Sequence, residues 1–341
     1  MNYQLFVGID ISKLTIDVAT LVNGIKDDIK HNQFNNDAEG FDKMLKWIQE
    51  MYSFGHDEMV FLLEHTGIYA LPICTFFSDK NLNYCLESPL QIVKSLGIKR
   101  GKTDKADSIA LVKYAYIHRE DIKLYTLPAR ILIKLKALLA YRNRMVKARK
   151  LLGTPSKELK DYSDKEIHSY VTSHSARQVK ELDQQIKNVD REIRSLIRSD
   201  KTLKRLYDLV KSVPGIGPQT ASYLLIYTKC FTAFENSRKF ACYAGLAPFE
   251  HQSGISIRGK TRVSYLANRQ IKTLLTSGAI AASIHDPEMS AYYQRKIELG
   301  KARLSVLNVI RNKMVSRVFA AVKRGTPFMK LYDHREKMVS A

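Results

Sequence analysis

Three observations predict an α/β fold that is followed by mainly helical segments. Over residues 1–128, short apolar runs rich in β-branched side chains alternate with stretches of helical periodicity. Residues 129–202 are strongly charged and almost free of Gly and Pro, which is typical of long helices. Residues 203–341 keep a helical periodicity but contain Gly-rich corners. We therefore predict three domains, with boundaries after residues 128 and 202.

The first domain is predicted to contain a mixed β-sheet. Residues 5–9, 15–21 and 31–35 predict three strands in a β-meander, and the short apolar run 59–63 and residues 83–86 predict two more. Helices are predicted after a cap at Asn36 or Asp37, over residues 69–78, from Ser88-Pro89 onwards, and over residues 104–116. This order is expected of an RNase H-like sheet, and other α/β folds fit the pattern almost as well.

The middle domain is predicted to consist of two long helices, over residues 131–152 and 175–197. The second carries a heptad pattern at Leu182, Ile186, Val189, Ile193 and Leu196. Such a seam is typical of a helical hairpin that packs on itself, and equally of a coiled-coil arm that joins subunits. The third domain is predicted to end in a helix over residues 302–324.

The charge of the chain points to a polyanionic partner. Its 341 residues include 55 Lys and Arg against 34 Asp and Glu, a formal net charge of +21. Nucleic acid is the first candidate, because neutralising phosphates releases condensed counterions. An anionic membrane surface is less favoured, since no long basic amphipathic helix lies at a terminus.

The cysteines and the N-terminal sequence predict a cytoplasmic protein. Four widely spaced cysteines, none in a CxxC pair, favour buried apolar residues in a reducing compartment over a zinc site. The first apolar run is short and meets Asp10, so we expect no signal peptide. No apolar stretch approaches the length that spans a membrane.

Four acidic residues predict a metal site. Asp10 and Glu64 each follow a predicted strand, and Asp104 and Asp107 lie at i and i+3 on one face of a predicted helix. Carboxylates at strand ends gather at one edge of a sheet, where a helix from the next layer can cover them. Such a cluster needs divalent cations to relieve its repulsion, and Mg²⁺ prefers these oxygen ligands. Two such ions can support phosphodiester cleavage.

Each acid also has a structural interpretation. An Asp after a strand is often a helix cap or a turn residue, and Asp104 is a candidate N-cap. The four acids together favour the metal site over these separate roles. A sugar-kinase-like or actin-like ATPase is disfavoured, because it needs a Gly soon after the first Asp, where Ile11, Ser12 and Lys13 stand here.

A Gly-rich turn over residues 213–221 predicts a second functional feature. Gly215 and Gly217 flank Ile216 between helical segments, as in a helix-hairpin-helix turn. Backbone N–H groups at the start of the next helix can hold a nucleic-acid phosphate. The alternative is a plain corner between two helices.

A third feature is a polar loop followed by a basic run. Residues 251–254 read His-Gln-Ser-Gly, and the cations Arg258, Lys260, Arg262, Arg269 and Lys272 follow without an acid among them. A Ser before Gly is usually a turn residue, and no His-Asp partner for a hydrolase triad is evident. The basic run is either a solvated surface or a track for DNA or RNA.

The three features together resemble the DEDD-type transposases of the insertion-sequence 110 (110/116/902) group. The resemblance covers nearly the whole chain and rests on the order of these blocks: Gly8-Ile9-Asp10-Ile11-Ser12-Lys13, Glu64, Thr103-Asp104-Lys105-Ala106-Asp107, Val213-Pro214-Gly215-Ile216-Gly217-Pro218, Ala244-Gly245-Leu246-Ala247-Pro248 and Gln252-Ser253-Gly254. It implies a RuvC-like (RNase H-like) catalytic domain and a C-terminal transposase domain.

The resemblance also implies roles for individual residues and partners. Asp10, Glu64, Asp104 and Asp107 would bind Mg²⁺, with Mn²⁺ as a substitute, and Ser253 would be the nucleophile that attacks a DNA phosphodiester. A structured non-coding guide RNA would pair with donor and target DNA, in a dimer or tetramer. We expect Gly215, Gly217, Lys102, Arg258, Lys260 and Arg262 to contact nucleic acid.

One departure from the family pattern and two alternatives remain. Members of this group commonly carry a Lys-x-Gly-Asn element before a later helix, where this chain has Tyr265-Leu266-Ala267-Asn268. The first alternative is a RuvC-like nuclease or junction resolvase that uses the four acids and water without serine chemistry. The second is a nucleic-acid-binding module without enzymatic activity.

Overall fold

The computed structural model describes residues 3–23, 28–97, 103–154, 164–253 and 257–329. The chain divides into two compact units, residues 1–127 and 128–341, and each is described by itself. Within the described residues, no helix has the length and apolar character that crossing a membrane requires.

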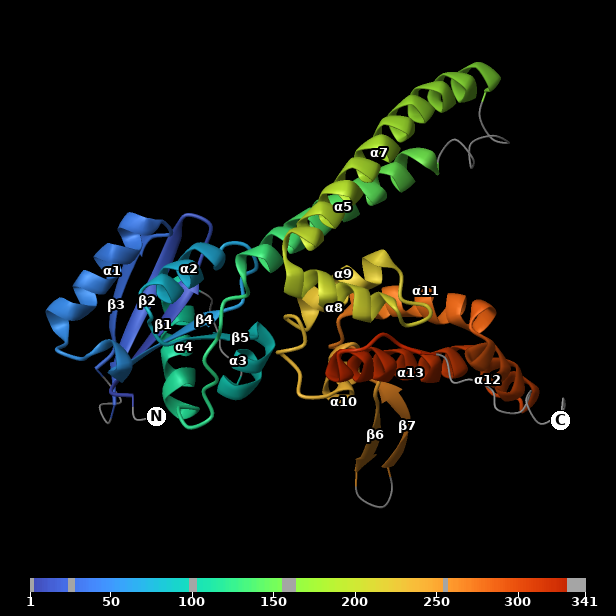
Figure 1. Ribbon diagram of the computed structural model, residues 1–341. Coiled ribbons are helices and arrows are strands. Elements are labelled where there is room, and N and C mark those ends of the chain that lie inside the picture. Colours follow the sequence, from blue (N-terminus) through green and yellow to red (C-terminus); the bar gives the residue numbers. More distant parts are fainter. Residues whose placement is uncertain (1–2, 24–27, 98–102, 155–163, 254–256, 330–341) are drawn as a thin grey trace. The chain divides into compact units, whose positions relative to one another are not determined.

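The first unit is built on a five-stranded mixed sheet with the order β3-β2-β1-β4-β5 (Figure 1). Its strands are β1 (Leu5–Ile11), β2 (Thr15–Val22), β3 (Lys30–Asn35), β4 (Met59–Glu64) and β5 (Tyr84–Glu87). The first three pair antiparallel as a meander, whereas β1, β4 and β5 are parallel. All five predicted strands are confirmed. Buried apolar runs mark β1, β2 and β4, whereas β3 has no fully buried residue.

Helices cover both faces of this sheet. The apolar residues Leu5, Val7 and Ile9 share a core with α1 (Ala38–Met51) and α2 (Leu71–Asp79), whereas Phe6 shares one with α3 (Pro89–Leu96) and α4 (Asp104–Ile117). A short 3-10 helix, η1 (His56–Glu58), precedes β4. Because side chains alternate along a strand, even-numbered positions of β1 face α4. Asp37, one of the two residues predicted as the cap, is the N-cap of α1, and its side chain accepts the N–H of Gly40.

Gly8 lets α4 approach the sheet closely. A Cβ atom at Gly8 would lie 2.3 Å from the backbone nitrogen of Val112 and 2.5 Å from the carbonyl oxygen of Ser108. Any side chain at this position would push the helix away from β1. The glycine therefore fixes the distance between the first turns of α4 and the end of β1, where Asp10 lies two residues further on.

The second unit begins with two long helices that run side by side, α5 (Arg130–Gly153) and α7 (Lys165–Ser199) (Figure 1). Ion pairs join them, from Arg142 Nε to Asp190 Oδ1 at 2.6 Å and from Arg149 Nη1 to Asp183 Oδ1 at 2.8 Å. Ile193 of the heptad pattern is buried in the same cluster as Leu135 and Leu139 of α5. At this part of the seam the helices pack within one chain, as the hairpin interpretation predicts.

The rest of the second unit is a helical body with one β-hairpin. The helices are α8 (Lys201–Lys211), α9 (Pro218–Tyr227), α10 (Ser237–Tyr243), α11 (Arg269–His285), α12 (Pro287–Glu298) and α13 (Arg303–Arg324). The hairpin, β6 (Pro248–Ser253) and β7 (Ile257–Val263), extends from this body (Figure 1). It corrects the expectation of a polar loop at residues 251–253, whereas Gly254 lies outside the described residues. Only Ile257 and Val263 of β7 are apolar, so its sequence gives a weak strand signal.

Candidate functional site

Asp10 lies on the face of the sheet that α4 covers. It is two residues after Gly8 in β1, and strand alternation places both on this face. The strand continues to Ile11, so Asp10 does not end it as the sequence suggested. Its partly buried carboxylate accepts the backbone N–H of Ile11 at 3.1 Å. Asp10 is therefore a strand residue on the face that α4 covers, and not a turn or cap residue.

Glu64 belongs to the same face. It is the last residue of β4 and stands two positions after Leu62, which shares a core with α4. β4 pairs parallel with β1, and Ile9 is opposite Leu63. Parallel pairing and alternation together bring Glu64 next to Asp10 at one edge of the sheet.

The first turn of α4 supplies the other two acids. Thr103 is its N-cap, with Oγ1 accepting the N–H of Ala106 at 3.1 Å. The capping interpretation of Asp104 is therefore wrong. Asp104 is exposed and Asp107 is partly buried. Both benefit from the positive end of the helix dipole, which favours negative charge in the first turn.

Burial and the other three carboxylates raise the pKa of Asp10. Desolvation is the largest cause, followed by the negative charges of Asp107, Asp104 and Glu64, and the result is a pKa of about 6. Asp10 thus lies close to every one of the other three acids. Among the described residues, no three His, Cys, Asp or Glu side chains already converge tightly enough to hold a metal ion. The raised pKa and the absence of a preformed metal site agree if the four carboxylates lie near one another but are held apart by their repulsion.

Two acids near this site were missed by the sequence analysis. Asp17 of β2 is opposite Asp10 in the strand register and is buried. Its oxygens interact with His31 Nε2 at 2.8 Å and accept a hydrogen bond from Gln33 Nε2 at 2.9 Å. Glu87 ends β5 opposite Glu64 and is partly buried. Its position after a predicted strand is the same signal that identified Glu64.

The two glycines of the helix-hairpin-helix turn have different surroundings. Gly215 has a φ of +83° and packs on α11, where an added Cβ would lie 2.5 Å from the carbonyl oxygen of Gly278. Close helix packing therefore explains this glycine. Gly217 precedes α9 as its N-cap, and an added Cβ would meet nothing within 4 Å. Because Gly217 stands beside the N–H groups at the start of α9, phosphate binding stays a prediction for this glycine in particular.

Ser253 is the last residue of β6, with Ile257 opposite it. It lies in the second unit, whereas the four acids lie in the first. Its side chain, and those of Arg258 and Lys260, lie outside what the structure describes. Arg258, Lys260 and Arg262 occupy every second position of β7, and Arg262 is exposed. Lys102 and Gly254 also fall outside the described residues.

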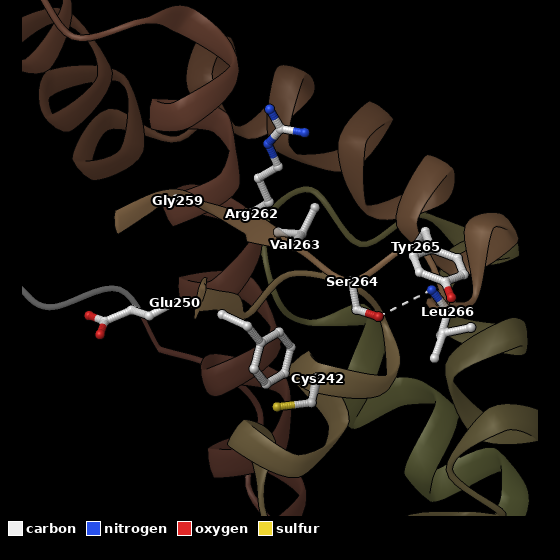
Figure 2. Close-up of a pocket in the computed structure, with 9 residues that line it drawn as sticks. Cys242, Glu250, Gly259, Arg262, Val263, Ser264, Tyr265 and Leu266 are labelled. Atoms are coloured by element: carbon white, nitrogen blue, oxygen red, sulfur yellow. Dashed lines mark hydrogen bonds between the residues drawn. The ribbon is translucent and has the colours of Figure 1, made fainter. Parts of the chain in front are cut away.

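A pocket of about 880 Å³ lies at the base of this hairpin (Figure 2). Cys242, Phe249, Arg262 and Tyr265 are among its lining residues. In Figure 2 the hydroxyl of Ser264 accepts the N–H of Leu266 at 3.2 Å, at the turn before α11. In the strand register Ser253 is opposite Ile257, whereas the pocket-lining Val263 is opposite Pro248 at the other end of β6. The pocket is thus separate from the candidate catalytic serine.

The turn that departs from the family pattern still starts a helix. Asn268 is the N-cap of α11, and its Oδ1 accepts the N–H of Ile271 at 3.1 Å. Its Nδ2 donates to the hydroxyl of Tyr243 at 2.9 Å. Ala267, at the position where a glycine is common, lies against Gly245. The retained Asn is sufficient to begin the helix.

Comparisons with known proteins match both units. Residues 7–154 match a transposase family whose name marks the DEDD domain of IS110-type enzymes, and residues 207–294 match the "Transposase IS116/IS110/IS902 family". The chain is similar to pilin gene-inverting proteins of Moraxella bovis and Moraxella lacunata. Each is 28% identical over 333 residues, which cover 95% of this chain and 98% of the relative. An IS110 insertion-element protein of Streptomyces coelicolor is 35% identical over 121 residues, which cover 36% of this chain and 30% of that protein.

Proposed function

The chain belongs to the IS116/IS110/IS902 family of transposases, and we propose that it cuts and rejoins DNA through the carboxylates of Asp10, Glu64, Asp104 and Asp107. The observation that carries this proposal is the position of the four acids, since Glu64 follows the strand residue opposite Ile9 and Asp104 and Asp107 lie in the first turn of the helix that covers this face. The raised pKa of Asp10, to which each of the other three acids contributes, supports it. The strand order and the helices on both sheet faces support an RNase H-like, RuvC-like assignment of the first unit.

The donor atoms of the four side chains suit a divalent metal ion, although no three of the described carboxylates already converge tightly enough to hold one. The four side chains offer only carboxylate oxygens, which are the ligands that Mg²⁺ prefers and that Mn²⁺ also accepts. A cation bound by them would stabilise the negative charge that develops at the reacting phosphate. The raised pKa of Asp10 supports this role, because four carboxylates without a cation disfavour full ionisation. Gly8 and the Thr103 cap hold the first turn of α4 in position for this task.

We further propose that Ser253 is the nucleophile. Its Oγ would form a bond to the phosphorus of a DNA strand as the bond from phosphorus to the leaving oxygen breaks. The serine would lose its proton to a base or to solvent, and the leaving oxygen would gain one. The phosphoserine link would keep the energy of the phosphodiester, so a DNA hydroxyl could reverse the step and rejoin the strands.

A structured guide RNA and a dimer or tetramer complete the proposal. The net charge of +21 supports a chain that holds RNA together with donor and target DNA. The relatives named for inverting a pilin gene support DNA rearrangement as the outcome. Sequencing the RNA that co-purifies with the protein, expressed beside its flanking DNA, tests the guide. A single structured RNA is expected, and recovery of only bulk cellular RNA would contradict it.

Strand cleavage tests the catalytic residues. With Mg²⁺ and the co-purified RNA, Asp10→Ala and Ser253→Ala should each lose cleavage, because one removes a metal-binding carboxylate and the other the nucleophile. Glu39→Gln on α1 and Ser264→Ala beside the hairpin are the matched controls, and both should retain it. A covalent protein–DNA product should form only with Ser253 present. Cleavage that survives in Ser253→Ala but not in Asp10→Ala would instead identify a metal-dependent nuclease that uses water.

A further inference from the structure

Two cations meet where α11 and α13 of the second unit pack together. Arg311 on α13 is only 7% exposed, and its Nη1 donates to Thr276 Oγ1 on α11 at 3.1 Å. Its Nε donates to the carbonyl oxygen of Leu307 at 3.3 Å. Lys272 lies one turn before Thr276, whose hydroxyl donates to the Lys272 carbonyl oxygen at 2.7 Å. Neutral oxygens are therefore the hydrogen-bond partners that the guanidinium has.

Neither cation has a counterion among the described residues. No carboxylate there forms an ion pair with Lys272 or Arg311, and the first turn of α11 contains no acid. Burial lowers the pKa of Arg311, and burial followed by the charge of Arg311 lowers the pKa of Lys272. Lys272 also lies near the positive end of the α11 dipole, which disfavours a cation. Within the described part of the chain, no opposite charge compensates these costs.

A partly buried arginine of the same helix shows the contrast. The side chain of Arg317 is 15% exposed, and its two terminal nitrogens pair with Asp286 and Glu288. The fold thus supplies two carboxylates for Arg317 and none for Arg311, although the two residues are less than two turns apart. A buried charge without an oppositely charged partner in the protein is expected where a ligand supplies the opposite charge.

The unpaired cations lie at the root of the β6–β7 hairpin. A Cβ atom on Gly245 would lie 3.7 Å from Lys272 Cδ, and β6 starts three residues after that glycine. The next residue, Leu246, accepts a hydrogen bond from Asn308 Nδ2 at 2.8 Å. Asn308 Oδ1 is buried and lacks a donor among the described residues. The two cations therefore lack an anion at the root of the hairpin, and a phosphate supplies one.

We propose that Lys272 and Arg311 bind a backbone phosphate of the nucleic acid at the root of the hairpin that carries Ser253. The proposal rests on the nucleic-acid substrate inferred above and adds a specific anchoring site to it. A phosphodiester has the charge and the acceptor oxygens that the two side chains lack. Held there, a strand would be fixed beside the hairpin independently of its base sequence.

Inorganic phosphate tests the anion site in the full-length protein. At constant ionic strength, replacing chloride with phosphate should raise the Tm of the wild type but not of Lys272→Met or Arg311→Met. Lys313→Met on α13 is the matched control, since Lys313 already pairs with Glu288 and its loss should leave the phosphate effect intact. In chloride, Arg311→Met should be at least as stable as the wild type, because an uncompensated buried charge is removed. A lower Tm of Arg311→Met together with an unchanged phosphate effect would overturn the site.

Binding to a DNA duplex and to a single-stranded RNA distinguishes the two sources of phosphate. Lys272→Met and Arg311→Met should reduce the slope of log affinity against log salt by about 0.9 on the duplex or about 0.7 on the single strand for one lost phosphate contact. The strand whose slope changes is the ligand. If the wild type binds both nucleic acids and the two variants show unchanged salt slopes on both, the phosphate site is wrong and the proposed function is unaffected. Phosphate-dependent stabilisation in a wild type that binds neither would support the anion site and contradict the proposed function.

Discussion

At the scale of single residues, Asp10 shows how the proposed catalytic site lowers the stability of the fold at neutral pH. Its carboxyl is partly buried near three other acids, and its pKa is raised to about 6. The folded protein therefore favours the protonated form more than the unfolded chain does, where an Asp has a pKa of about 3.9. This contribution to stability is fully present below pH 4 and is lost as the pH rises through 6.

Asp10→Asn should stabilise the metal-free protein at neutral pH. The amide is neutral at every pH, so it avoids the loss of about 1–3 kcal/mol that the wild type incurs above pH 6. Urea unfolding in a chelator should show the variant as more stable at pH 7.5 and close to the wild type at pH 4. Adding Mg²⁺ should then stabilise the wild type more than the variant. A variant that is less stable than the wild type at pH 7.5 would contradict the crowding of carboxylates around Asp10.

Sequence patterns identify residues whose surroundings are local. Asp10, Glu64, Asp104 and Asp107 could be proposed because strand ends and an i, i+3 spacing are visible in the chain. Arg311 could not, because one Arg within a helical pattern looks the same whether a carboxylate reaches it or not. Its lack of a partner depends on the packing of α13 against α11 and on residues distant in the sequence. Tertiary contacts alone separate it from Arg317.

At the scale of elements, buried strands and capped helices were the predictable parts. β1, β2 and β4 are apolar on both faces because helices cover the sheet on two sides, and that pattern survives in the sequence. The β6–β7 hairpin was missed because it is a short two-stranded ribbon with few apolar residues, such as Phe249, Ile257 and Val263. The heptad seam of α7 left two interpretations open, because packing within a chain and between chains requires the same residues.

The two ion pairs between α5 and α7 are expected to contribute unequally to stability. Asp190 accepts hydrogen bonds from Arg142 Nε at 2.6 Å and Nη2 at 3.1 Å, and from Gln219 Nε2 on α9 at 2.9 Å. Its side chain is 22% exposed, whereas that of Asp183, which pairs with Arg149, is 43% exposed. Asp190→Ala should lower the free energy of unfolding by about 1–3 kcal/mol, and Asp183→Ala by less than about 1 kcal/mol. Thermal or urea unfolding of the two variants checks this, and equal losses would show that Asp190 does not join the three helices.

At the scale of the whole molecule, the net positive charge comes entirely from one unit. Residues 1–127 carry 14 Lys and Arg against 17 Asp and Glu, a formal net charge of −3. The whole chain has 55 and 34, so residues 128–341 carry 41 against 17, a net charge of +24. By net charge, residues 1–127, which contain the four acids, do not attract a polyanion, whereas residues 128–341 do. The charge separates the task of holding nucleic acid from the proposed task of cutting it.

Separate expression of the two units tests this division. Each has its own hydrophobic core, so both are expected to unfold cooperatively as fragments. The 128–341 fragment should bind duplex DNA with most of the affinity and the salt dependence of the full chain, because counterion release depends on the cations that contact phosphates. The 1–127 fragment should bind weakly in a chelator and gain affinity when Mg²⁺ neutralises its acids. Electrophoretic or fluorescence titrations at several salt concentrations measure both. A 1–127 fragment that binds DNA tightly without metal would show that local cations outweigh its net charge, and the division of tasks would then be wrong.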